Sequence, residues 1–313
     1  MFPPIEPFAT GMLPVSDGNR IFWETSGNPD GKPALTLHGG PGGGLGSGYR
    51  KRFDPERYLI VGLDQRGCGR SRPLVTDPDA NLDSNTTQAL IADIEALREH
   101  LGIDQWMVTG LSWGTTLALA YAQAHPERVS ELVLFAVTTT TPAEVEWVTE
   151  SMGNLFPEEW HALVTAIDRQ PGQRVIDAAC ANITDPDPEI RAAGIRAWCR
   201  WEDAHISLDP NRGPMLADDD PESQAIFATL VTHYWSHGAF LGPTELLDGM
   251  DRIAHIPGVL IHGRLDVSSP LMTSWRLHRA WPGSEWIVVD GEGHGGPAMM
   301  EEMVKAIARF ATG

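Results

Sequence analysis

The stretch Val108-Thr-Gly-Leu-Ser112-Trp-Gly-Thr-Thr116 decides how the rest of this chain is interpreted. It holds the pentapeptide G-x-S-x-G between an apolar run at 106–108, which predicts a buried strand, and an Ala/Leu-rich segment at 117–124, which predicts a helix packed on a sheet. A sharp turn from strand to helix strains its central residue and lifts that side chain above the sheet. The two glycines are needed because a Cβ at either position would collide with the neighbouring strand and helix. We therefore predict that Ser112 is presented as a nucleophile.

The flanking sequence alternates between strand and helix patterns. Two short strands at 13–16 and 21–25 flank the turn tripeptide Asp17-Gly-Asn19 and predict an antiparallel hairpin. Further strands are expected at 34–37, 58–63, 129–137, 258–262 and 286–289, and helices at 87–101, 271–280 and 298–310. Strands that alternate with helices predict an α/β fold, with a mostly parallel sheet that carries helices on both faces.

The middle of the chain has a different character. From about 141 to 247 the pattern is helical, acidic and rich in tryptophan, with no convincing buried strand. We interpret this segment as a helical cap inserted into the α/β domain. The expected organisation is therefore a core built from residues 1–140 and 248–313, with a cap formed by 141–247.

Composition excludes several classes of partner. The chain has 313 residues and a net charge of −19, so nucleic acid and anionic membranes would repel it. Its start has no basic region followed by an apolar one, and no apolar run approaches the roughly 18 residues of a membrane span. The three cysteines cannot all pair and show no metal-ligand spacing, which favours a reducing, cytoplasmic compartment and no bound metal. We expect no cofactor. The sequence does not indicate an oligomeric state.

A glycine-rich loop, His38-Gly-Gly-Pro-Gly-Gly-Gly44, follows the strand at 34–37. Glycines leave backbone N–H groups uncovered, so the loop is either a flexible connection or an oxyanion-binding loop. A phosphate cradle is disfavoured because the chain has no G-x-x-x-x-G-K-[ST] motif.

A serine hydroxyl needs a base that takes its proton. In strand–turn–helix architectures of this kind the acid and the base follow the serine in that order, each after a late strand. Asp266 follows the strand that ends at His262, and His294 follows the strand that ends at Val289. We predict that His294 is the general base and later the general acid, and that Asp266 orients and stabilises its imidazole.

These motifs resemble those of the proline iminopeptidases, serine peptidases of the α/β-hydrolase fold that carry a helical cap. The resemblance covers most of the chain and rests on His38-Gly-Gly-Pro-Gly-Gly-Gly44, Asp64-Gln-Arg-Gly-Cys-Gly-Arg-Ser71, Gly110-Leu-Ser-Trp-Gly114, Gly263-Arg-Leu-Asp266 and Gly293-His-Gly295. It implies an oxyanion hole formed by the backbone N–H groups of Gly40 and Trp113. Pro41 has no N–H and cannot contribute.

In this family the cap supplies specificity, with carboxylates for the substrate's amine and aromatic side chains for the pyrrolidine ring. The segment Arg196-Ala-Trp-Cys-Arg-Trp-Glu202 resembles the family's cap segment. By resemblance, Glu202 binds the amine, and Trp201 and Tyr234 line the substrate pocket. Two positions depart from the family pattern: Val231 replaces a second glutamate, and Thr138 replaces a frequent phenylalanine.

The leading functional interpretation is an aminopeptidase that releases N-terminal proline, or a related small residue, from short peptides through an acyl-enzyme on Ser112. The alternative is an amidase or esterase of the same fold that acts on aminoacyl amides, esters or a small pathway metabolite. A binding protein without turnover is disfavoured, because binding alone does not require Asp266 and His294 behind Ser112.

Overall fold

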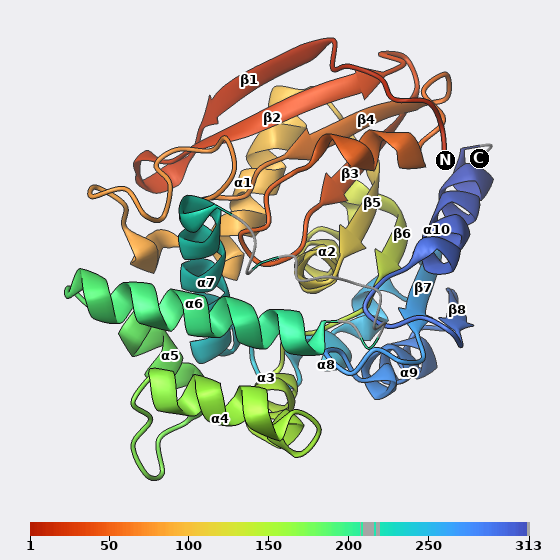
Figure 1. Cartoon of the computed structure of the whole chain (residues 1–313). Coiled ribbons are helices and arrows are strands. Elements are labelled where there is room, and N and C mark those ends of the chain that lie inside the picture. The colour runs from red at the N-terminus through yellow and green to blue at the C-terminus, as the bar shows by residue number, and fades with distance from the viewer. Residues whose placement is uncertain (207, 209–215, 217–219, 312–313) are drawn as a thin grey trace.

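A computed structural model describes residues 1–206, 208, 216 and 220–311. Its centre is one eight-stranded sheet in the order β1-β2-β4-β3-β5-β6-β7-β8 (Figure 1). The strands are β1 Ala9–Pro14, β2 Arg20–Gly27, β3 Lys32–Leu37, β4 Tyr58–Leu63, β5 Trp106–Leu111, β6 Val129–Phe135, β7 Gly258–Gly263 and β8 Ser284–Val289. β2 pairs antiparallel with β1 and β4, and every other pair is parallel. The predicted α/β class with a mostly parallel sheet is confirmed.

Neighbouring residues of the central strands point to opposite faces of the sheet, as the period of two requires. Leu35, Val108 and Leu260 pack into one apolar cluster, and Ala34 and Met107 pack into another on the far face. The first cluster is covered by α1 Thr87–His100, α2 Trp113–Ala124 and α9 Leu271–Ala280, and the second by α10 Pro297–Phe310. Because both faces of the sheet are covered, the sequences of its central strands are nearly continuous apolar runs.

Most of the remaining helices lie between β6 and β7 in the sequence. They are α3 Pro142–Thr149, α4 Pro157–Ala166, α5 Val175–Ile183, α6 Pro188–His205, α7 Pro221–Ser236 and α8 Glu245–Asp248. Figure 1 shows α4, α5 and α6 gathered away from the strands, with α6 between the sheet domain and α4. Residues of α3 to α7 share an apolar cluster of their own around Trp198 and Trp201. The domain boundaries at 141 and 247 stay a prediction.

One expected strand is too long. β6 ends at Phe135 rather than at Val137, because Ala136 adopts a positive φ of 50° and turns the chain. The backbone N–H of Val137 then donates to the ring of His262 instead of continuing the sheet. Among the residues that the structure describes, no helix is long and apolar enough to cross a membrane.

Candidate active site

The turn between β5 and α2 has the strained geometry that its sequence predicts. Ser112 sits between the two elements with φ 53° and ψ −123°, a conformation that L-residues rarely adopt. A Cβ on Gly110 would lie 2.3 Å from the carbonyl oxygen of Gly114, and one on Gly114 would lie 2.3 Å from that of Leu37. Both positions therefore require glycine.

A chain of hydrogen bonds links Ser112 to the two other predicted residues. Ser112 Oγ lies 2.9 Å from His294 Nε2, and His294 Nδ1 lies 2.9 Å from Asp266 Oδ2. The loops after β7 and β8 bring Asp266 and His294 together across 28 residues of sequence. Burial acts to raise the pKa of Asp266, but the positive charge and hydrogen bond of His294 outweigh it and lower that pKa below its usual value. An ionised Asp266 accepts the Nδ1 proton, so Nε2 is free to accept from the serine hydroxyl.

A second, fully buried histidine holds the loop of Asp266 in place. His262 Nδ1 accepts from the backbone N–H of Val137 at 3.1 Å, so its Nε2 carries the proton and donates to the carbonyl of Ser269 at 2.7 Å. The backbone N–H of Ser269 in turn donates to Asp266 Oδ1 at 2.8 Å. Burial lowers the pKa of His262 and favours its neutral form. Sequence reasoning missed this role, because a histidine inside an apolar strand carries no sign of its partners.

The glycine-rich loop approaches the serine turn from β3. Gly40 and Trp113 both line the cavity at Ser112, and Gly40 adopts a φ of 112°. Within the described part of the chain, neither backbone N–H donates to a protein acceptor. Trp113 is also the first residue of α2, where the helix dipole favours negative charge. These two N–H groups are therefore available to an oxyanion formed at Ser112.

Gln65 connects the glycine-rich loop to the serine turn. Its side-chain nitrogen donates to the carbonyl of His38 at 3.0 Å, and its side-chain oxygen accepts from the indole N–H of Trp113 at 2.9 Å. Its backbone N–H donates to His38 Nε2 at 3.1 Å. One buried side chain thus sets the separation between the segments that carry Gly40 and Trp113.

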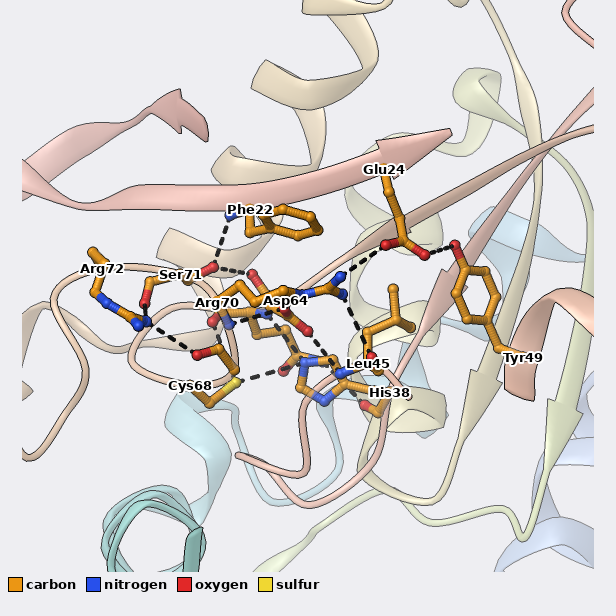
Figure 2. A network of polar contacts seen from close by, with 12 residues as sticks. Phe22, Glu24, His38, Leu45, Tyr49, Asp64, Cys68, Arg70, Ser71 and Arg72 are labelled. Atoms are coloured by element: carbon orange, nitrogen blue, oxygen red, sulfur yellow. Dashed lines mark hydrogen bonds and ion pairs between the residues drawn. The ribbon is translucent and has the colours of Figure 1, made fainter. Parts of the chain in front are cut away.

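A buried polar network supports the far end of the same loop (Figure 2). Asp64 accepts from the backbone N–H of Leu45 at 2.7 Å and from Arg70 Nε at 2.7 Å. Arg70 also donates to Glu24 at 2.8 Å, and Glu24 accepts from Tyr49 at 2.9 Å. Both carboxylates are only 1 % exposed, so removal of either partner would leave a buried charge uncompensated.

Cys68 lies beside this network in Figure 2, with its Sγ 3.7 Å from His38 Nε2. Burial raises the pKa of its thiol, so the sulfur is neither exposed nor ionised. Cys68 is therefore a small core residue and not an activated nucleophile.

A small cavity with a volume of about 190 Å³ is lined by Ser112 and His294. This lies below the roughly 300–1,000 Å³ of sites for drug-sized ligands, so it suits one small group. Its apolar walls come from the segment between β6 and β7. They are Val145, Val148, Ile206, Leu216, Phe227 and Trp235.

Glu202 reaches this cavity from α6. It is 4 % exposed, and its Oε1 has no hydrogen-bond partner in the described structure. Burial raises the pKa of Glu202 to about 8, against the opposing charge of His294. A buried acceptor without a partner is costly, and such groups mark functional sites.

Comparisons with known proteins place this site in a family. Residues 33–297 match the family model described as alpha/beta hydrolase fold. The chain is 45 % identical to a protein named probable proline iminopeptidase from Streptomyces coelicolor, with 100 % of this chain and 98 % of the relative covered. It is 42 % identical to a proline iminopeptidase from Xylella fastidiosa, with 99 % of each chain covered. This chain belongs to the proline iminopeptidase family of α/β-hydrolases. The predicted resemblance is confirmed.

The fold is shared more widely than the sequence. The crystal structure of a proline iminopeptidase from Mycobacterium smegmatis matches with a TM-score of 0.58 at 23 % identity, with 97 % of this chain and 98 % of that one covered. At that identity the match supports the α/β-hydrolase fold alone.

The structure places two of the expected pocket residues, Trp201 and Tyr234, outside the described cavity at Ser112. Trp201 and Tyr234 are each 1 % exposed, and neither is among the described residues that line the cavity at Ser112. Trp201 packs inside the helical insertion against Phe156, with ring centroids 6.4 Å apart. Tyr234 packs behind the serine turn, 4.7 Å from the Trp113 ring, because its face of α7 meets the sheet domain. Phe227 and Trp235, both on α7, do line the cavity.

The structure also locates Val231 and Thr138, the two residues that depart from the family pattern. Val231 is fully buried in the apolar cluster of the helical insertion and does not line the described cavity. Thr138 does line it, and its hydroxyl donates to Glu144 at 2.9 Å. Glu144 also accepts from the backbone N–H and hydroxyl of Thr139, so it holds the segment after β6 against α3.

Proposed function

We propose that this protein is a serine aminopeptidase that releases N-terminal proline, or a related small residue, from short peptides. One observation carries the proposal: Glu202, a buried carboxylate whose Oε1 has no hydrogen-bond partner in the described structure, lines the same small cavity as Ser112 and His294, which are hydrogen-bonded in a chain with Asp266. Such a cavity suits a small residue that carries a positive charge next to the bond to be cleaved.

The reaction begins when Ser112 Oγ attacks the carbonyl carbon of the first residue and His294 takes the serine proton. The oxyanion that forms accepts hydrogen bonds from the backbone N–H groups of Gly40 and Trp113. His294 then returns the proton to the leaving amine, and the C–N bond breaks to give an acyl-enzyme. Water, activated by His294, releases the residue. Asp266 keeps the imidazole in the productive tautomer and stabilises its protonated form.

Specificity comes from the helical insertion formed by residues 141–247, which we propose acts as a cap over the active site. Glu202 pairs with the protonated N-terminal amine, which replaces the proton that burial favours on the empty carboxylate. Val145, Val148, Phe227 and Trp235 provide apolar walls for the pyrrolidine ring. A substrate with a blocked amine would leave Glu202 buried without a charge partner, so a free N-terminus is required.

We also propose a cytoplasmic location, supported by Cys68 and Cys180, neither of which forms a disulfide. The expected partner is a short peptide.

The test is a panel of prolyl p-nitroanilide, its N-acetylated form and p-nitrophenyl acetate. We expect kcat/KM for the free-amine anilide to exceed that for the acetylated anilide by at least tenfold. Equal rates on the two anilides, or turnover of the ester alone, would replace the aminopeptidase proposal with the amidase or esterase alternative.

A further inference from the structure

A second residue that lines the cavity, His205, has a buried ring nitrogen, Nε2, with no hydrogen-bond partner in the described protein. His205 lies one helical turn after Glu202 on α6 and is 1 % exposed. Its Nε2 lies 3.6 Å from Glu202 Oε2. Both residues line the same cavity as Ser112 and His294.

The neighbours of His205 determine which ring nitrogen carries its proton. Ser268 Oγ donates to the backbone carbonyl of His205 at 2.8 Å and lies 2.8 Å from its Nδ1. A hydroxyl has a single proton, so both bonds form only when Nδ1 donates to Ser268. Nε2 then presents a lone pair toward the cavity. Burial lowers the pKa of His205 to about 3, which keeps the ring neutral.

The cavity thus places two acceptors side by side, Glu202 and His205 Nε2. Trp198 and Trp201 on the same helix also have unpartnered indole N–H groups, but neither indole ring lines the cavity. When Glu202 is ionised, two buried acceptors side by side are unfavourable in the empty protein. A ligand that brings a positive charge and two N–H donors would satisfy both at once.

We propose that His205 Nε2 is the second acceptor for the substrate's N-terminal ammonium, and that with Glu202 it forms a binding site for a secondary ammonium. The proposal rests on the proposed function. A protonated N-terminal proline carries two N–H bonds on its ring nitrogen, one for each acceptor. The pairing of Glu202 with His205 also explains how the site holds an ammonium although Val231, which replaces the family's second glutamate, offers no acceptor.

The experiment uses His205→Asn and His205→Gln in the full-length protein. Asparagine can still donate to Ser268 but has no atom at the Nε2 position, whereas the longer glutamine can place an oxygen near it. Each variant is assayed with prolyl p-nitroanilide and p-nitrophenyl acetate, and its Ki is measured for L-prolinamide and for the uncharged isostere tetrahydrofuran-2-carboxamide.

We expect His205→Asn to lower the ratio of anilide to ester kcat/KM by roughly tenfold or more, the effect of losing one hydrogen bond to a charged group. Its Ki for prolinamide should rise by a similar factor, with little change for the oxygen isostere. His205→Gln should recover most of both losses. A purely structural role would lower both activities together.

Several outcomes would overturn the proposal. One is a His205→Asn variant whose ratio and prolinamide Ki stay within twofold of wild type, and another is a His205→Gln variant that loses as much as His205→Asn. If His205→Asn does not fold, the Ser268→Ala variant provides the test. Without the Ser268 hydroxyl the proton of His205 is no longer held on Nδ1, so prolinamide binding should weaken. Unchanged binding would refute the proposal. Failure of the aminopeptidase assignment itself would be seen in the wild type, as equal rates on free and acetylated anilides.

Discussion

The indole N–H of Trp113 donates a 2.9 Å hydrogen bond to the side-chain oxygen of Gln65, which lies 48 residues earlier in the chain. The same amide donates to the carbonyl of His38. Gln65 therefore spans the two segments whose N–H groups are proposed to bind the oxyanion. A small error in their separation would weaken a transition-state interaction more than ground-state binding.

Replacement of Gln65 by alanine should consequently lower kcat by about tenfold to a hundredfold with little change in KM. Steady-state kinetics on prolyl p-nitroanilide measures the effect. Gln105→Ala is the matched control, because Gln105 is exposed and distant from the cavity. A rise in KM at constant kcat would show that Gln65 shapes the substrate pocket instead.

Ser112→Ala should abolish turnover, with a loss on the order of 10⁴–10⁶ in kcat. The same variant should no longer be labelled by a fluorophosphonate probe, which forms a covalent bond with an activated serine. Intact-protein mass spectrometry and circular dichroism check the labelling and the fold. Residual activity of even a tenth would place the nucleophile elsewhere.

Asp266→Asn should reduce kcat by roughly 10⁴-fold, because an amide at this position can donate to Nδ1 and favours the unproductive imidazole tautomer. The variant should still bind L-prolinamide, because Asp266 does not line the described cavity. The decisive readouts are single-turnover rates and the Ki for prolinamide. An unchanged rate would mean that another acid orients His294.

Glu202 should make the stability of the protein depend on pH. Its pKa rises to about 8 in the folded protein from an ordinary value of 4.5, so between these pH values the folded state holds a proton that the unfolded state has lost. Stability from this group therefore falls as pH rises from about 5 to 8 and levels off above that range.

The variant Glu202→Gln removes this titration, so its free energy of unfolding relative to wild type should increase between pH 5 and pH 8.5. Urea denaturation at the two pH values measures the difference. Glu158→Gln is the control, because Glu158 is exposed on α4 and the same comparison should show no change. A parallel pH dependence in wild type and Glu202→Gln would contradict the proposed burial of an unpaired carboxylate.

Much of the fold and the central residues of the site follow from local sequence patterns. Alternating apolar runs and helical patterns predict the strands and helices because side-chain periodicity reflects burial directly. Ser112, Asp266 and His294 are recognisable because each stands in a short loop directly after a strand, and the carboxyl ends of parallel strands meet at one edge of a sheet.

The tertiary structure decides which neighbouring side chains complete the site. Trp198, Trp201, Glu202 and His205 have spacings typical of one helix face, yet of these only Glu202 and His205 line the described cavity. The rotation of α6 about its axis depends on packing against other helices, which a single segment cannot specify. Likewise, the proton on His205 depends on Ser268, 63 residues away. Sequence periodicity determines which residues share a face, whereas long-range packing determines what that face meets.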